Sequence, residues 1–276
     1  MLAVVLTHAA GDDYGLIWGY YGLHAWIVPF GRGAVNFFFA LSGFIIPYVY
    51  NNEGVREYLR RRFIRIFPTY WLVNFALLAA GLMIPALGAL PQYQPWNLLA
   101  SFLILPQPQM PLLPLAWTLE HELVFYALFA VWIWRPLIGT LGFMLWAICI
   151  GCSVGPDVII NRHNIFFFIG LFLALVVRWH STRVILFLEQ LSWPRFMVAF
   201  GDASYAIYLV HLPALLLWSK ILRYMGFSAM GAVIFAILSL LAVSTGVAFH
   251  IVVEKPLLRR LRRLAIGRTR ELAQSG

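Results

Sequence analysis

Between Arg65 and Glu120 the chain carries not one charged side chain, and this stretch is long enough to cross a bilayer more than once, since one crossing needs about 20 residues. Of the 276 residues, 62% are hydrophobic and 11% are charged, whereas soluble domains average about 25% charged residues. This composition excludes a soluble globule. The sequence therefore predicts an all-α integral membrane protein, with residues 1–276 forming one polytopic bundle of about 8–10 transmembrane helices.

Basic residues mark the predicted cytoplasmic edge of the membrane. Twelve of the twenty lysines and arginines lie in two blocks, Arg56 to Arg65 and Lys255 to Arg270. Such blocks face anionic lipid on the cytoplasmic side, which predicts that both termini are cytoplasmic and that residues 255–276 form a basic cytoplasmic tail. Neither block carries the interleaved aromatic residues of a nucleic-acid groove, so we expect membrane lipids as partners and no nucleic acid.

Apolar runs between polar connections predict the individual helices. The predicted full spans are 33–50, 67–90, 115–134, 137–154, 165–177, 204–222 and 229–253, and together with the short first segment they make about eight. The run 98–105 is too brief to cross and is predicted to lie at the interface or to re-enter. Residues 184–200 contain two charged residues and a proline and are predicted to be a cytoplasmic or half-inserted segment. Residues 1–10 are also too short to span, which indicates either missing upstream residues or half a helix.

An ionisable side chain at bilayer depth costs several kcal/mol, so each one is a hypothesis about function. His8 lies in the first apolar segment, and its imidazole can accept a proton from an attacking hydroxyl near neutral pH. The alternative is a neutral histidine that hydrogen-bonds to a neighbouring helix.

Glu122 belongs to a polar stripe within the span predicted over 115–134. Thr118, Glu122 and Tyr126 are one helical turn apart on the same face. A carboxylate at this place is suited to orient a catalytic imidazole. A metal site is not expected, because His121-Glu122 lacks the second histidine of H-E-x-x-H.

Two further groups of polar residues have competing interpretations. Arg62 and Arg65 lie at the predicted cytoplasmic mouth of a span, where arginines either signal topology or bind phosphate through their planar fork of donors. Tyr208 and His211 are three residues apart and share a helix face, and for His211 core packing and substrate contact both stay open. Asp202 is predicted to cap the start of that helix.

Six segments carry a resemblance to a known family, in matching order along the chain. They are L-T-H-A (6–9), A-V-N-F-F-F-A-L-S-G-F (34–44), R-R-F-I-R-I-F-P-T-Y-W (61–71), W-T-L-E-H-E-L-V-F-Y (117–126), D-A-S-Y-A-I-Y-L-V-H (202–211) and V-E-K-P (253–256). Together they resemble the membrane-bound acyltransferase-3 family, the integral-membrane O-acyltransferases that modify exopolysaccharide, O-antigen and related glycans. The resemblance covers essentially the whole chain and looks most like the exopolysaccharide acetyltransferase branch.

The resemblance implies an O-acetyltransferase of the bacterial inner membrane, with acetyl-CoA as acyl donor and a glycan or lipid-linked saccharide as acceptor. His8 matches the catalytic histidine of the family, and Glu122 matches its acidic residue. Arg62 and Arg65 match its cytoplasmic arginine motif and are expected to hold CoA, with no metal involved. The residues expected to bind substrate are Asn36, Ser42, Tyr126, Tyr208 and His211.

The sequence departs from the family in two places. Family members carry an R-G pair about one helical span before the catalytic histidine, whereas this chain begins seven residues before His8, so the first helix is expected to be truncated. Asn36 stands where the family often has aspartate, which removes a charge from that position.

Two other classes of function stay open as alternatives. Intramembrane His, Glu and Arg residues also mark the routes of transporters, so one alternative is a flippase for a lipid-linked glycan. A transporter is expected to show inverted repeats with paired broken helices, and no such repeat is visible in the sequence. The other alternative is a catalytically inactive, truncated homologue that acts as a membrane partner. The sequence specifies neither the acceptor sugar nor the oligomeric state.

Overall fold

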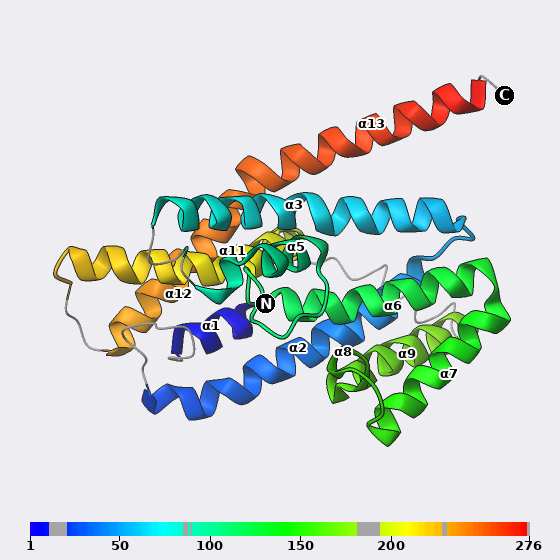
Figure 1. Cartoon of the computed structure of the whole chain (residues 1–276), viewed down its shortest axis with the longest axis horizontal. Coiled ribbons are helices and arrows are strands. Elements are labelled where there is room, and N and C mark those ends of the chain that lie inside the picture. The colour runs from blue at the N-terminus through cyan, green and yellow to red at the C-terminus, as the bar shows by residue number, and fades with distance from the viewer. Residues whose placement is uncertain (11–20, 85–87, 89, 181–193, 228–230, 275–276) are drawn as a thin grey trace. The chain divides into compact units, whose positions relative to one another are not determined.

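The computed structural model describes residues 1–10, 21–84, 88, 90–180, 194–227 and 231–274 (Figure 1). Within these residues every regular element is a helix, which confirms the predicted all-α class. The α-helices are α1 (Leu2–Ala10), α2 (Tyr21–Val49), α3 (Val55–Met83), α5 (Pro95–Leu103), α6 (Ala116–Trp134), α7 (Pro136–Cys152), α8 (Asp157–Ile160), α9 (Ile165–His180), α11 (Arg195–Tyr224), α12 (Gly231–Phe249) and α13 (Lys255–Gln274). Two 3-10 turns, η1 (Pro91–Tyr93) and η2 (Arg162–Asn164), and one π turn, η3 (His250–Glu254), complete the set.

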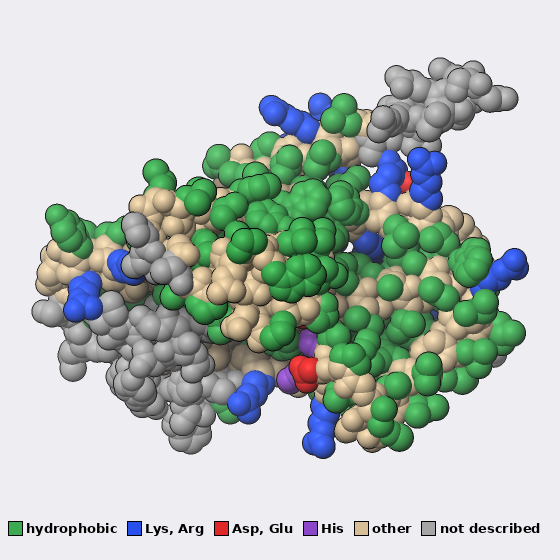
Figure 2. Space-filling model, in the orientation of Figure 1, with side chains coloured by type: hydrophobic (Ala, Val, Ile, Leu, Met, Phe, Trp, Pro, Cys, Tyr) green, Lys and Arg blue, Asp and Glu red, His purple; other side chains and the backbone are tan. Residues whose placement is uncertain are grey.

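Four of the described helical segments are long and apolar enough to cross a membrane. They are Pro29–Val49, Val55–Met83, Arg195–Tyr224 and Ala232–Leu264, and the apolar helix Pro136–Cys152 is shorter. Large apolar side chains are widely exposed, and Figure 2 shows them over much of the visible face. This is the surface expected of helices that contact lipid, because a soluble protein rarely exposes so much contiguous apolar area.

The larger number of crossings expected from the sequence stays a prediction for the other helices. α6 has 19 residues, but Glu120, His121 and Glu122 lie in its first half. α9 has 16 residues, against about 20 for a full crossing.

The chain divides into two compact units that are interleaved along the sequence. Unit 1 comprises Met1–Ala34, Ile64–Tyr70 and Trp193–Gly276, and unit 2 comprises Val35–Phe63 and Trp71–Ser192. The helices α2 and α3 each contribute residues to both units.

In unit 1, the short helix α1 packs against α11 and α12. Val5 and Ala9 of α1 share one buried core with Ile207 of α11 and Leu238 of α12. A Cβ atom on Gly246 of α12 would lie 2.6 Å from the Cα atom of Ile207. Glycine therefore allows the two long helices to approach each other closely, as small residues do in membrane bundles.

Stacked aromatic rings form the centre of unit 2. The ring of Phe167 on α9 stacks on Phe39 of α2 at 4.5 Å between centroids and on Phe125 of α6 at 4.9 Å. A Cβ atom on Gly43 of α2 would collide with the backbone oxygen of Phe167. The packing of α2 on α9 therefore depends on the absence of a side chain at this position.

Two predicted boundaries are corrected by the structure. α11 begins at Arg195 after Pro194, so Asp202 lies on an exposed face inside the helix and does not cap its start. The helix is continuous from Arg195, so its start lies about two turns before Asp202. The predicted cytoplasmic segment 184–200 lies largely outside the described residues, and its last residues form the first turns of α11.

Candidate active site

His8 and His211 form a pair inside unit 1. The Nδ1 atom of His8, on α1, lies 3.1 Å from the Nε2 atom of His211, on α11. The ring centroids are 5.2 Å apart and the ring planes are inclined by 35°. His211 is completely buried, whereas His8 is half-buried. The sequence predicted both residues for the site but did not predict that they contact each other.

The backbone of α11 holds the other side of the His211 ring. Its Nδ1 atom lies 2.7 Å from the carbonyl oxygen of Tyr208 and 3.2 Å from that of Ile207. The ring of Tyr208 lies 6.0 Å from the ring of His211, which confirms that the two side chains share a helix face.

Glu122 is the centre of a hydrogen-bonded group in unit 2. The hydroxyl of Tyr126 donates to its Oε1 atom, and the hydroxyl of Ser42 donates to the same atom at 3.3 Å. Glu122 is 5% exposed. Glu122 and Tyr126, which the sequence places on one helix face, therefore contact each other. Ser42 of α2 contacts the same carboxylate.

Arg62 lies beside this group, with its guanidinium carbon over two tyrosine rings. The distance is 5.5 Å to the ring centroid of Tyr58 and 5.5 Å to that of Tyr126, within the range of cation–π interactions. The Nε atom of Arg62 is buried and has no hydrogen-bond partner within the described residues. Sequence reasoning missed Tyr58, although its place one turn before Arg62 on α3 was a signal.

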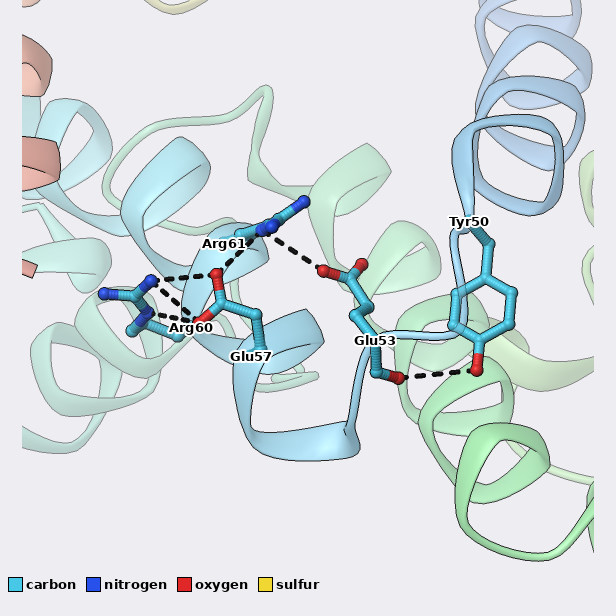
Figure 3. Close-up of polar contacts among 5 residues, drawn as sticks. All are labelled: Tyr50, Glu53, Glu57, Arg60 and Arg61. Carbon is cyan, nitrogen blue, oxygen red and sulfur yellow. Dashed lines mark hydrogen bonds and ion pairs between the residues drawn. The ribbon is translucent and has the colours of Figure 1, made fainter. Parts of the chain in front are cut away.

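The neighbouring arginines make ion pairs instead. Figure 3 shows Arg60 and Arg61 around the carboxylate of Glu57, at 2.7 and 2.8 Å, with Arg61 also 3.1 Å from Glu53. Tyr50 donates to the backbone oxygen of Glu53 and fixes the turn before α3. Arg65 is exposed and belongs to the part of α3 that lies in unit 1. Arg62 therefore contacts tyrosine rings, whereas Arg60 and Arg61 form ion pairs with glutamate.

Asn36 contacts a histidine that the sequence analysis did not single out. The Oδ1 atom of Asn36, on α2, lies 2.6 Å from the Nδ1 atom of His163, in η2. Trp117, at the start of α6, lies 6.0 Å from the His163 ring and 5.7 Å from the His121 ring. Figure 2 shows that acidic and histidine side chains gather at one place on the visible face. The signal for His163 was its place in the polar connection N-R-H-N between two apolar runs.

A buried carboxylate in unit 1 is paired across the π turn. The Nδ1 atom of His250 lies 2.5 Å from the Oε2 atom of Glu254, and Glu254 is 2% exposed. Glu254 is the glutamate of the V-E-K-P segment, and π turns are frequent at functional sites.

The predicted site residues therefore form separate groups. His8, His211 and Tyr208 meet in unit 1, whereas Ser42, Glu122, Tyr126 and Arg62 meet in unit 2, which also holds the contact of Asn36 with His163. The idea that Glu122 orients His8 stays a prediction, because the two residues belong to different units.

Comparison with known proteins shows which family the chain resembles. The family model for the acyltransferase domain of the acyltransferase-3 family matches residues 1–188, which include His8, Arg62 and Glu122. The exopolysaccharide production protein ExoZ of Rhizobium meliloti (strain 1021) is 27% identical over an alignment 304 residues long, gaps included, that covers 86% of this chain and 93% of ExoZ.

A second relative matches over a shorter stretch. Acyltransferase MdmB of Streptomyces mycarofaciens is 34% identical over an alignment 116 residues long, gaps included, that covers 38% of this chain and 29% of MdmB. No solved structure matches the chain significantly. Because the family model covers more than half of the sequence, the chain belongs to the acyltransferase-3 family of membrane acyltransferases.

Proposed function

We propose that the protein is a membrane O-acyltransferase that moves an acetyl or other short acyl group from acyl-CoA to a hydroxyl of a cell-surface or lipid-linked glycan. Membership of the family and the similarity to ExoZ, a protein named for exopolysaccharide production, support the class. The contact between His8 and His211 is the observation that carries the proposal, because an imidazole held by a second polar group is the usual arrangement of a general base.

In the proposed reaction, His8 accepts the proton of the acceptor hydroxyl while the hydroxyl oxygen bonds to the acyl carbonyl carbon. His8 then returns that proton to the sulfur of the donor as the carbon–sulfur bond breaks. The products are the acylated glycan and the free thiol. Holding thioester and hydroxyl together supplies part of the rate enhancement, because a bimolecular step becomes effectively unimolecular.

Arg62 is proposed to bind the phosphates of the donor. Arg60 and Arg61 are paired with the carboxylate of Glu57, whereas the guanidinium of Arg62 lies over tyrosine rings and keeps donors available for an anion. In this proposal Glu122 holds the ring of Tyr126 against Arg62. The exposed Arg65 is proposed to contribute a second positive charge to phosphate binding.

The acceptor is proposed to contact Asn36 and the residues around it. Asn36 and His163 offer hydrogen-bonding groups, and the half-buried ring of Trp117 offers an apolar face beside them. A few polar groups beside an aromatic surface are typical of sites that orient a small polar ligand.

The test is transfer of labelled acetyl from acetyl-CoA to a glycan fraction by membranes that contain the protein. We expect wild-type protein to transfer label and His8→Ala to lose at least about a hundredfold in rate, the lower range for removal of a general base. We expect Arg62→Ala to raise the KM for acetyl-CoA. Arg61→Ala is the matched control and keeps the wild-type KM, because an exposed ion pair contributes little.

The acyltransferase proposal would be contradicted if the folded protein labels none of the glycan fractions prepared from acylating bacteria. Movement of an unmodified lipid-linked glycan across the membrane by the same protein would instead support the transporter alternative.

A further inference from the structure

The hydrogens on the two imidazole rings of unit 1 can be assigned from the chain of contacts around them. The Nδ1 atom of His211 lies 2.7 Å from the carbonyl oxygen of Tyr208. A carbonyl oxygen can only accept a hydrogen bond, so the Nδ1 atom of His211 carries the hydrogen.

The second nitrogen of His211 then carries a lone pair. His211 is 0% exposed, and a second proton would make it a buried cation, which is costly without a paired charge. The ion pairs of the described residues include none with His211. The neutral ring therefore presents its Nε2 atom as an acceptor toward His8.

The same logic fixes the ring of His8. Its Nδ1 atom lies 3.1 Å from the Nε2 atom of His211, so the Nδ1 atom of His8 must be the donor of this hydrogen bond. A general base must start in its neutral form, and a neutral imidazole carries one hydrogen. With that hydrogen on Nδ1, the Nε2 atom of His8 is the nitrogen that accepts the proton. The buried core of Val5 and Ala9 with Ile207 holds α1 against α11, which keeps the pair in place.

We propose that His211 is a positioning residue that holds His8 in the Nδ1–H tautomer, so that the Nε2 atom of His8 is the base of the acyl transfer. This inference rests on the proposed function. It also assigns to His211 the orienting role that the sequence had suggested for Glu122.

The proposed step can be written atom by atom. The Nε2 atom of His8 takes the proton of the acceptor hydroxyl, the oxygen–carbon bond forms and the carbon–sulfur bond breaks. The Nε2 atom then gives its proton to the departing sulfur. His211 neither gains nor loses a proton, because it accepts one hydrogen bond from His8 and donates one to Tyr208 throughout. Its contribution is orientation of the base, as in other nucleophile–base–orienter arrangements.

The direct test is nitrogen-15 NMR of the full chain in lipid bilayers near neutral pH, with histidine labelled in both ring nitrogens. The signals of His8 and His211 are assigned from the spectra of His8→Asn and His211→Gln. We expect both rings to be protonated at Nδ1 and unprotonated at Nε2. A His8 ring protonated at Nε2, or a His211 ring protonated at both nitrogens, would overturn the inference.

Kinetics supply a second test that separates positioning from folding. Gln at position 211 keeps an acceptor near the place of the Nε2 atom, whereas Leu fills the space without one. We expect His211→Leu to lower kcat by about a hundredfold or more without changing the KM for acetyl-CoA, because the tautomer is no longer fixed. We expect the kcat of His211→Gln to be at least about tenfold higher than that of His211→Leu.

The outcomes distinguish this inference from the proposed function. Equal activity of the Gln and Leu variants, or a loss confined to KM, would overturn the positioning role even if the wild-type enzyme is active. Wild-type protein without transferase activity would contradict the proposed function, and the NMR spectrum would still decide the tautomer by itself.

Discussion

Tyr126 makes two contacts that differ in kind, and they link the charged residues of unit 2. Its hydroxyl donates to Glu122, and its ring lies beneath the guanidinium of Arg62. Tyr58 offers the matched comparison, because its ring also faces Arg62 at 5.5 Å while its buried hydroxyl has no hydrogen-bond partner within the described residues.

The two tyrosines are therefore predicted to respond differently to removal of the hydroxyl. Tyr126→Phe leaves a buried carboxylate with one donor fewer and is expected to destabilise the protein by about 1–3 kcal/mol. Tyr58→Phe removes an unsatisfied hydroxyl and is expected to be neutral or stabilising. Thermal unfolding in detergent measures both, and equal melting temperatures for the two variants would contradict the assigned contact.

The contact of Asn36 with His163 is predicted to act as one unit in acceptor binding. Asn36→Leu and His163→Ala are each expected to raise the KM for the glycan and to leave the KM for acetyl-CoA unchanged. The double variant is expected to be no worse than the poorer single variant, because residues that share one hydrogen bond are not additive. Additive effects in this double-mutant cycle would show that the two residues act independently.

Among the helices, α2 and α9 depend most clearly on small residues. Gly43 of α2 lies against the backbone of Phe167, and Gly170 of α9 lies against the backbone of Ala40. Both approaches involve main-chain atoms, so a side chain cannot be accommodated by a change of rotamer.

Adding one methyl group at either glycine is predicted to push the helices apart. Gly43→Ala and Gly170→Ala are each expected to cost about 1–3 kcal/mol of stability, the usual range for overpacking. Gly151→Ala on α7 is the control, because a Cβ atom there meets nothing within 4 Å and alanine favours the helix by up to about 1 kcal/mol. A loss of stability in the Gly151 variant comparable to the others would contradict the packing explanation.

At the scale of the whole molecule, the two compact units are interleaved along the sequence. α2 and α3 each pass from one unit to the other, so neither unit is a continuous piece of sequence. The one polytopic domain expected over residues 1–276 stays a prediction.

The orientation expected from the basic residues can be tested on the intact protein. In a background with both native cysteines replaced by serine, Asn52→Cys is expected to react with an impermeant thiol reagent only after the membrane is opened. The positive-inside rule places the arginine block near Asn52 in the cytoplasm, and the three predicted spans 67–90, 115–134 and 137–154 then place Asp157 on the opposite side. Asp157→Cys is therefore expected to react in intact spheroplasts. The reverse pattern would invert the proposed orientation.

Local patterns in the sequence were sufficient to predict the bounds of several helices. The predicted spans 115–134 and 137–154 agree closely with α6 and α7, because an apolar run ends at Arg135 and Pro136 begins the next helix. The start of α11 differs from the prediction: polar residues near Asp202 indicate a boundary at residue 204, whereas the helix begins at Arg195. Polar side chains at single positions do not end a helix whose other face is buried.

By itself, the sequence determined the membrane class, the family resemblance and the polar residues that are proposed for the site, because these depend on composition and on neighbours within a helical turn. Only the tertiary structure decided which of them meet. His8 contacts His211 from 203 residues away, and Ser42 contacts Glu122 from 80 residues away. Such contacts are set by how closely helices pack, and that depends on glycines and aromatic rings from distant segments. The partner of His8 could therefore not be read from any stretch of sequence alone.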